Sequence, residues 1–278
     1  MSAITLTAGL IQREIVPHDP AGNLFSTLET MQRLVEQEVD LICLSELWLT
    51  GMINPTDAES SNVVSTIDGP TVDALRDFCR TAGIYLSAGT IALKEKDGLK
   101  NSALIIDPSG EIALKYDKVH LFAPMGEDRV YEPGDSLEAV DINGVGVGVI
   151  VCYDLRFPSM SRTLARAGVE VILVPAMWPD ARIYPWETLL RARAMENQVY
   201  VVGINGLCNQ NGVYIPGHSM FVGPHGDALN QPEMRESVIV RKLDISKLRK
   251  LRSEICYLDE EVEISDVNWH AKVNESGG

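Results

Sequence analysis

Short apolar runs that alternate with segments of helical periodicity constrain the fold of this chain more than any other feature of its sequence. Each run is rich in Val, Ile and Leu and is bounded by polar or turn-forming residues, which is typical of β-strands. The runs lie at residues 4–11, 40–45, 84–92, 102–107, 145–151, 170–174 and 199–204, with further strand-like runs near 218–222 and 237–243. Strands and helices in this order predict an α/β layered protein.

Helical segments lie between several of these runs. The first two each present one apolar face, formed by Leu24, Leu28, Met31 and Val35 and by Val72, Leu75, Cys79 and Ala82. Pro70 stands where it can open the second helix. We expect a third helix over 159–167, ending before Gly168, and a fourth over about 183–197, where apolar residues repeat every four positions.

Residues 99–118 predict a β-hairpin rather than a strand and a helix. Two apolar runs are joined there by Asp107-Pro108-Ser109-Gly110, whose proline and glycine suit a tight turn. A hairpin is antiparallel, whereas strands joined through helices are usually parallel. The sheets are therefore expected to be mixed.

The domain organisation follows from the even spacing of the apolar segments. No Ser/Gly/Pro-rich linker or block of like charges divides the 278 residues, so one domain is expected, with a core over about 3–245. Residues 246–278 are expected to form a C-terminal extension. Its Tyr257 and Trp269 favour contact with a neighbouring subunit, whereas its acidic, polar composition is equally typical of a frayed terminus.

Charge and cysteine content exclude several classes of protein. The 24 basic residues are scattered among 39 acidic ones, which argues against binding of nucleic acid. The N-terminus lacks the basic start and apolar stretch of a signal peptide, so a cytoplasmic protein without a membrane partner is expected. The five cysteines are odd in number and far apart, which indicates neither a disulfide framework nor a Cys-x-x-Cys metal site.

Cys152 ends the apolar run 145–151 and precedes Tyr153-Asp154-Leu155-Arg156-Phe157-Pro158. A thiol at such a strand end points into the crevice where α/β proteins usually build their sites. Free cysteines are also common core residues, as we expect for Cys43, and local context alone slightly favours that interpretation for Cys152. The glycines at 144, 146 and 148 lack the Gly-x-Gly-x-x-Gly spacing of a dinucleotide loop and indicate close packing of a central strand.

A nucleophilic thiol needs a base, and two further residues stand in suitable places. Glu46 ends the run 40–45 as Cys152 ends its own, so parallel strands would bring the two side chains together. Lys118 follows the hairpin, and an ammonium in a closed pocket can stabilise an oxyanion. Taken singly, Glu46 is more often a solvated strand end and Lys118 a surface charge.

Together the three residues resemble the signature blocks of the nitrilase superfamily of carbon–nitrogen hydrolases. Glu46 lies in Leu-Ser-Glu-Leu-Trp-Leu-Thr-Gly, Lys118 in Lys-Tyr-Asp-Lys-Val-His-Leu-Phe and Cys152 in Val-Cys-Tyr-Asp-Leu-Arg-Phe-Pro, in the order and approximate spacing of that family. The resemblance implies an αββα sandwich that pairs between subunits into an αββααββα body, as a homodimer or a higher even-numbered oligomer. It also implies that no metal or organic cofactor is needed.

The resemblance further implies a role for each residue in the hydrolysis of a small carboxamide. Cys152 attacks the amide carbon, Glu46 shuttles the proton to the leaving ammonia, and Lys118 with the backbone N–H of Tyr153 stabilises the oxyanion. Many members carry a second glutamate near the lysine, for which this chain offers Glu127 or Glu132, and we select Glu127.

The blocks look most like the omega-amidase branch, which deamidates monoamides of dicarboxylic acids. The free carboxylate of such a substrate needs a cationic partner, for which Arg156 or Arg182 is available, although Arg156 is equally suited to a structural ion pair. Trp178 is about equally suited to wall the acyl pocket and to pack the core alone. An N-carbamoyl amidase or a nitrilase would use the same three residues. An inactive scaffold or binding protein is the alternative of another class, against which the intact Glu, Lys and Cys argue.

Overall fold

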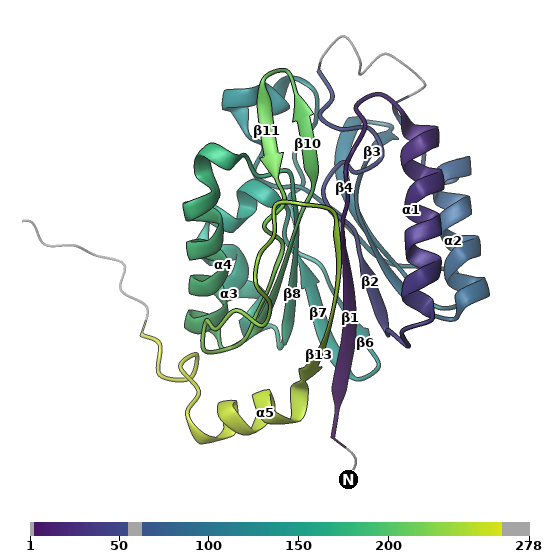
Figure 1. Cartoon of the computed structure of the whole chain (residues 1–278). Helices are drawn as coiled ribbons and strands as arrows, with labels where there is room; N and C mark the ends of the chain where they lie inside the picture. Colours follow the sequence, from purple (N-terminus) through teal and green to yellow (C-terminus); the bar gives the residue numbers. More distant parts are fainter. Residues whose placement is uncertain (1–2, 55–62, 263–278) are drawn as a thin grey trace, which may run out of the picture.

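The computed structural model describes residues 3–54 and 63–262, and it contains two β-sheets that face each other between two pairs of helices (Figure 1). This αββα arrangement with mixed sheets confirms the fold expected from the sequence. The apolar residues that line the space between the sheets come from both of them and form one core cluster. A second cluster lies between the first sheet and its helices.

The first sheet has six strands in the order β13-β1-β2-β3-β4-β5. Strands β1, β2 and β3 are parallel to one another, and the remaining neighbours are antiparallel. The bounds of these strands are β1 Thr5–Gln12, β2 Leu41–Cys43, β3 Tyr85–Glu95, β4 Gly98–Ile106, β5 Ile112–Asp117 and β13 Ser237–Asp244. Helices α1 (Pro20–Val35) and α2 (Pro70–Ala82) pack on its outer face, as Figure 1 shows.

The second sheet has five strands in the order β12-β9-β8-β7-β6, with β7, β8 and β9 parallel. Their bounds are β6 Ala139–Ile142, β7 Val145–Val149, β8 Val171–Ala176, β9 Tyr200–Asn205 and β12 Met220–Val222. Helices α3 (Pro158–Arg166) and α4 (Ile183–Asn197) cover its outer face (Figure 1). A separate hairpin of β10 (Leu207–Gln210) and β11 (Val213–Pro216), which the sequence analysis did not predict, follows β9.

The predicted local signals act as expected at most element ends. Pro70 stands in the first turn of α2, and Gly83 ends that helix in the left-handed conformation, with φ +68°. The predicted hairpin is formed by β4 and β5. One expectation was wrong in detail, because Gly144 lies in the turn before β7 with φ +81°, and only Gly146 and Gly148 lie within that strand.

The start of the predicted C-terminal extension is a helix, α5 (Ile245–Glu254). Its Ile245 and Leu248 are buried in the core shared by the two sheets, and Arg249 forms an ion pair with Glu170 at 2.7 Å between Nε and Oε1. The rest of the extension beyond residue 262, which includes Trp269, lies outside the described residues. Among the described helices, none combines the length and the apolarity that a membrane crossing requires.

Candidate active site

The candidate site lies where four strands from both sheets end. Glu46 comes three residues after the end of β2, Lys118 directly follows β5, Cys152 follows β7 and Met177 directly follows β8. Strand ends of this kind leave side chains free to point into a crevice, because the backbone there no longer pairs with a neighbour. Residues far apart in the chain are brought together at this edge.

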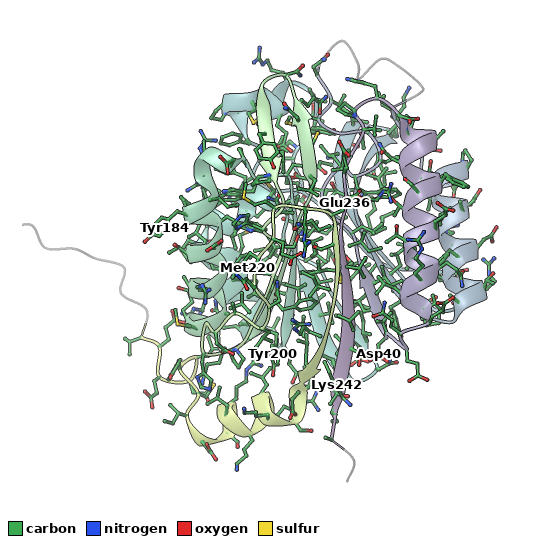
Figure 2. All side chains as sticks on the ribbon, viewed as in Figure 1. Asp40, Tyr184, Tyr200, Met220, Glu236 and Lys242 are labelled. Atoms are coloured by element: carbon green, nitrogen blue, oxygen red, sulfur yellow. The ribbon has the colours of Figure 1, made fainter. Side chains whose placement is uncertain are left out.

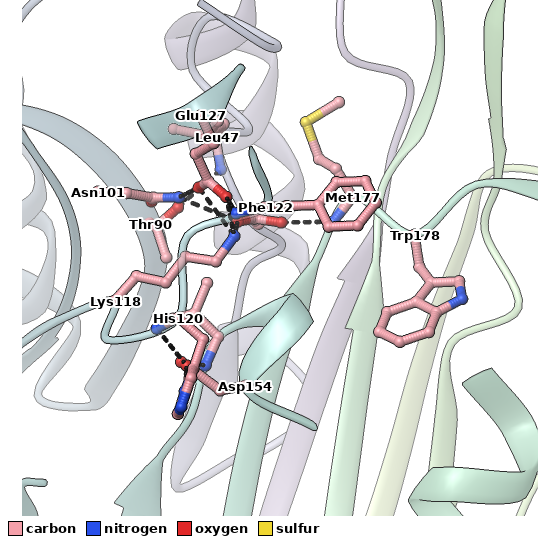
Figure 3. Close-up of polar contacts among 12 residues, drawn as sticks. Leu47, Thr90, Asn101, Lys118, His120, Phe122, Glu127, Asp154, Met177 and Trp178 are labelled. Carbon is pink, nitrogen blue, oxygen red and sulfur yellow. Dashed lines mark hydrogen bonds and ion pairs between the residues drawn. The ribbon is translucent and has the colours of Figure 1, made fainter. Parts of the chain in front are cut away.

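Lys118 is the centre of a buried ionic cluster. Its Nζ lies 2.9 Å from Oε1 of Glu46 and 2.8 Å from both carboxylate oxygens of Glu127. Only 3% of Glu46 and 2% of Lys118 are exposed, so solvent screens these ion pairs weakly. Figure 3 shows the polar ends of Lys118, Asn101 and Glu127 turned toward one another.

Three neutral donors hold the two carboxylates in place. Asn101, a buried residue of β4, donates from Nδ2 to Oε1 of Glu46 and to Oε1 of Glu127, at 3.0 Å in each case. The backbone N–H of Met177 donates to Glu46 at 2.8 Å, and that of Phe122 donates to Glu127 at 2.7 Å. Each glutamate is therefore fixed by more than its ion pair.

The ordinary preference of a buried amine for its neutral form is reversed at Lys118. Burial by itself lowers the pKa of the Lys118 ammonium, but the carboxylates of Glu46 and Glu127 outweigh burial and hold that pKa well above its usual value. The amine is thus a permanent cation at physiological pH. It supplies fixed positive charge where a substrate oxygen could develop negative charge.

Cys152 lies on a strained turn at the start of a short 3₁₀ helix, Cys152–Arg156. Its φ of +46° is in the left-handed region that residues with a side chain rarely adopt, and such strain clusters at functional sites. Burial raises the pKa of the Cys152 thiol well above its usual value, and the nearby carboxylate of Glu46 raises it further, while the ammonium of Lys118 opposes both. The resting sulfur is therefore a neutral thiol.

Two adjoining cavities open at the thiol. The first has an empty volume of about 480 Å³, including its part open to solvent, and is lined by Glu46, Lys118, Cys152, Glu127, Tyr131 and six mostly apolar neighbours. The second, of about 300 Å³ on the same measure, shares Cys152, Phe122, Met125 and Met177 with the first and continues to Tyr153, Arg156, Trp178 and Arg182.

The structure brings the predicted residues together on two sides of the thiol. Glu46, Lys118 and Glu127 surround it on one side, whereas Glu132, the other candidate for the second glutamate, is exposed to solvent. Arg156 and Trp178 lie on the other side, with the guanidinium carbon of Arg156 4.9 Å from the centre of the Trp178 ring. Arg156 has no carboxylate partner among the residues that the structure describes.

Trp178 lies at the boundary between the second cavity and the core. It lines the second cavity, yet it is buried in the core, where its ring centre lies 5.5 Å from that of Trp186. Its indole N–H donates to the carbonyl of Arg182 at 2.7 Å. Tyr153 packs against Phe122 and Phe157, so its ring also forms part of the wall.

Sequence reasoning missed Asn101, Tyr131 and the backbone N–H of Met177. Asn101 stands between Lys100 and Ser102 in a strand whose other residues are apolar or glycine, and a buried amide in an inner strand is a signal that could have pointed to it. The Tyr131 hydroxyl lies in the lining of the first cavity, buried and without a hydrogen-bond partner among the described residues. No metal-binding group of three His, Cys, Asp or Glu side chains occurs in the described part of the chain.

This arrangement can perform acyl transfer. It unites a thiol, a carboxylate placed to accept the proton of that thiol, and a fixed cation suited to a developing oxyanion, all within one small and mostly apolar chamber. A neutral thiol paired with a carboxylate suits a reaction in which proton transfer accompanies attack.

Comparison with known proteins agrees with this chemistry. Residues 7–253 match the family described as carbon-nitrogen hydrolase. The chain is 33% identical over 256 residues to the 2-oxoglutaramate amidase of Paenarthrobacter nicotinovorans, covering 88% of this chain and 86% of that one. It is 36% identical over 235 residues to omega-amidase YafV of Yersinia enterocolitica, covering 84% and 86%.

The fold is shared with solved structures of the same family. XC1258 from Xanthomonas campestris, described as a CN-hydrolase superfamily protein with an arsenic adduct in its active site, superposes with a TM-score of 0.84. The two sequences are 29% identical, and the superposition covers 95% of this chain and 100% of that one. This chain is therefore a member of the carbon–nitrogen hydrolase family and an enzyme that hydrolyses amide bonds.

Proposed function

We propose that this enzyme is an omega-amidase, which cleaves the terminal amide of a dicarboxylic acid monoamide and releases ammonia through a thioester on Cys152. The observation that carries the proposal is the shared cavity in which Cys152 meets Glu46, Lys118 and Glu127. The second cavity supports the choice of substrate, because it offers cationic side chains for a free carboxylate. The names of the relatives, 2-oxoglutaramate amidase and omega-amidase, point to the same class.

In the first half of the reaction the sulfur of Cys152 forms a bond to the amide carbon while Glu46 accepts the thiol proton. The carbonyl oxygen becomes an oxyanion, stabilised by the ammonium of Lys118 and by the backbone N–H of Tyr153. The C–N bond then breaks, and Glu46 gives the proton to the departing nitrogen, which leaves as ammonia. The cavity that Cys152 and Glu46 line together supports this proton path.

In the second half a water molecule replaces ammonia beside Glu46. Glu46 accepts a proton from this water as its oxygen attacks the thioester carbon, and the same cation stabilises the second oxyanion. The C–S bond breaks, the sulfur regains its proton from Glu46, and a dicarboxylic acid leaves. One carboxylate thus serves both halves, as microscopic reversibility of the proton steps requires.

Glu127 acts by orienting Lys118 and does not itself exchange protons in this scheme. Its two oxygens hold the ammonium at 2.8 Å, and its own position is fixed by the Phe122 N–H and Asn101. An ammonium that is already aligned loses no free energy to reorganisation as the oxyanion forms.

The distal carboxylate of the substrate is assigned to Arg156 and Arg182, with Trp178 and Tyr153 as the walls around the carbon chain. Both arginines line the second cavity, and each lies over an aromatic ring rather than against a carboxylate: Arg156 over Trp178, and Arg182 over Phe122 at 5.2 Å. A guanidinium held in this way keeps its N–H donors for an incoming anion.

An ammonia-release screen tests the reaction directly. Wild type and Cys152→Ala are assayed with succinamate and 2-oxoglutaramate, neutral amides such as propionamide, N-carbamoyl amino acids and aliphatic nitriles. We expect the charged monoamides to give the highest kcat/KM, with no turnover by Cys152→Ala. Highest turnover of carbamoyl compounds or nitriles would replace the omega-amidase proposal, and no turnover of any compound would favour an inactive scaffold.

A comparison of a charged and a neutral amide separates the role of the two arginines in binding from the cleavage of the amide bond. Arg156→Met and Arg182→Met should raise KM for succinamate about 10-fold or more, since a bidentate ion pair is worth about 1.5–3 kcal/mol, and should leave propionamide turnover unchanged. The neutral amide is the matched control, because it has the same scissile bond and no carboxylate. Equal losses on both substrates would reject the assignment.

We further propose that the chain acts in the cytoplasm as an even-numbered homo-oligomer. Tyr184 supports the homo-oligomer, because this large side chain on α4 is 78% exposed and projects from the outer face of the molecule (Figure 2). Met195 on the same helix is also exposed. Light scattering coupled to gel filtration should give a dimer or larger assembly, and Tyr184→Glu should shift it toward the monomer.

A further inference from the structure

Asp154 is a buried carboxylate that the proposed reaction does not use. It has no measurable exposure to solvent, and both of its oxygens accept hydrogen bonds from two donors. Burial of a carboxylate costs free energy unless hydrogen-bond donors surround it, and the neighbours of Asp154 supply these donors. Asp154 lies two residues after Cys152, so its hydrogen-bond partners show which residues hold the Cys152 turn in place.

The partners of Asp154 belong to the two segments that carry Lys118 and Cys152. On the first segment, the Tyr116 hydroxyl donates to Oδ2 at 2.7 Å, and the His120 N–H donates to Oδ1 at 2.8 Å. These residues are the second neighbours of Lys118 on either side. On the second segment, the N–H of Val151, the residue just before Cys152, donates to Oδ2 at 2.9 Å.

The ring of His120 strengthens the same link. Its Nδ1 lies 2.8 Å from Oδ1 of Asp154, as the dashed line in Figure 3 marks, and the ring stacks on Phe157 with centroids 3.6 Å apart. Phe157 directly follows the 3₁₀ helix that begins at Cys152. His120 therefore contacts this turn at Asp154 and at Phe157.

We propose that Asp154 is a positioning residue that holds the Cys152 turn and the Lys118 segment at a fixed separation. The proposal rests on the proposed roles of Cys152 as nucleophile and Lys118 as oxyanion donor. Cys152 has a strained φ of +46°, and a strained turn persists only when its surroundings over-determine it. The Val151–Asp154 hydrogen bond fixes the residue before the strain, and the other three bonds fix the cation across the site.

The test measures the reactivity of the Cys152 thiol separately from the turnover of substrate. Asp154→Asn keeps the size of the side chain, but its amide N–H₂ must face at least one backbone N–H that now donates to a carboxylate oxygen. Turnover of succinamate gives kcat and KM. Mapping of iodoacetamide alkylation on every cysteine gives the reactivity of Cys152 against partly exposed Cys256, with buried Cys43 and Cys79 as reporters of unfolding.

We expect Asp154→Asn to lower kcat about 10²-fold, because displacement of reacting groups by about 1 Å has an effect of this size, with KM within threefold of wild type. Alkylation of Cys152 should slow about tenfold relative to Cys256 while Cys43 and Cys79 stay protected. Val72→Ala, a core truncation in the outer helix α2, is the control for a general loss of stability. It should alter neither kcat nor the rate of Cys152 alkylation at 25 °C. Wild-type values of kcat and Cys152 alkylation in folded Asp154→Asn would overturn the proposal.

Tyr116→Phe decides the question if Asp154→Asn does not fold. It removes one hydroxyl and one of the four hydrogen bonds to Asp154, and should lower kcat and Cys152 alkylation about tenfold. Unchanged values for this variant would likewise reject the positioning role. Alkylation does not require a substrate, so a wild-type enzyme inactive on succinamate would refute the proposed function while leaving the role of Asp154 measurable.

Discussion

At the scale of single residues, the site depends on how charges are held around one buried cation. Lys118 contacts Glu46 and Glu127, yet the two glutamates differ in surroundings. Glu46 accepts a hydrogen bond from the N–H of Met177, whereas Glu127 accepts one from the N–H of Phe122. The same residue type thus receives two roles from its neighbours.

This difference gives a prediction for Glu127→Gln. The amide can replace only part of the carboxylate contact to Lys118 and removes a negative charge that aligns the ammonium. We expect kcat to fall about 10²-fold, as for loss of a group that preorganises an oxyanion donor, with KM within threefold. Steady-state kinetics on succinamate measure this. Glu132→Gln is the control, because Glu132 is exposed, and equal losses in the two variants would contradict the assignment.

At the scale of elements, an irregularity in β3 seats the loop that carries Glu46. The pairing of β3 with β4 shifts register between Ser87 and Thr90, and Gly89 within this bulge has φ +58°. A Cβ at Gly89 would lie 1.9 Å from the carbonyl oxygen of Ser45. The bulge also places Thr90, whose N–H donates to that oxygen and whose hydroxyl accepts the Leu47 N–H. Glu46 is thus held on both sides.

Gly89→Ala should therefore damage both stability and activity. The methyl group meets backbone and not a flexible side chain, so we expect a loss of about 3–5 kcal/mol in the free energy of unfolding and a fall in kcat of about 10²-fold. Urea denaturation and kinetics at 15 °C measure the two effects.

Gly83→Ala is the matched control for this element. Gly83 has a similar φ of +68°, but nothing lies within 4 Å of its added Cβ. Strain alone should cost about 1–2 kcal/mol there, with unchanged kcat. A Gly89→Ala variant that behaves like Gly83→Ala would show that close approach to Ser45 is unimportant.

At the scale of the whole molecule, two apolar layers bury thiols that do not take part in the reaction. Cys43 lies in the core between the sheets, and Cys79 and Cys208 lie in the cluster of the first sheet and its helices. Burial raises the pKa of Cys79 to about 12 and that of Cys208 to about 11, from a reference value of 9.0. Burial also raises the pKa of Cys43.

These shifts predict that the protein loses stability at alkaline pH. A thiol whose pKa is raised on folding stabilises the folded state fully below its unfolded pKa, near pH 9, and the contribution is lost as pH rises toward the folded value. Between pH 9 and 11 Cys79 alone should account for a loss of about 2 kcal/mol. Urea unfolding at both pH values measures the loss, which should be smaller by that amount in Cys79→Ala. The same pH dependence in that variant would contradict the prediction.

The sequence by itself determined the mixed pairing and most of the element order, although it gave no prediction of the β10–β11 hairpin. Periodicity sufficed for helices such as α2, because burial of one face imposes a 3.6-residue repeat on any helix against a sheet. The order of the Glu46, Lys118 and Cys152 blocks predicted the family. Weakly apolar elements such as β6, with alternating exposed and half-buried residues, gave no such signal.

Only the tertiary structure decided which of these residues meet. Glu127 and Glu132 are close in sequence and equally acidic. Only the path of the chain after Phe122 makes Glu127 a half-buried partner of Lys118 and leaves Glu132 exposed. Asn101, Asp154 and the N–H of Met177 each contact a residue between 26 and 131 positions away: Glu127, Tyr116 and Glu46 respectively. Such contacts depend on sheet register and on which strand ends coincide, and local propensity carries no information on either.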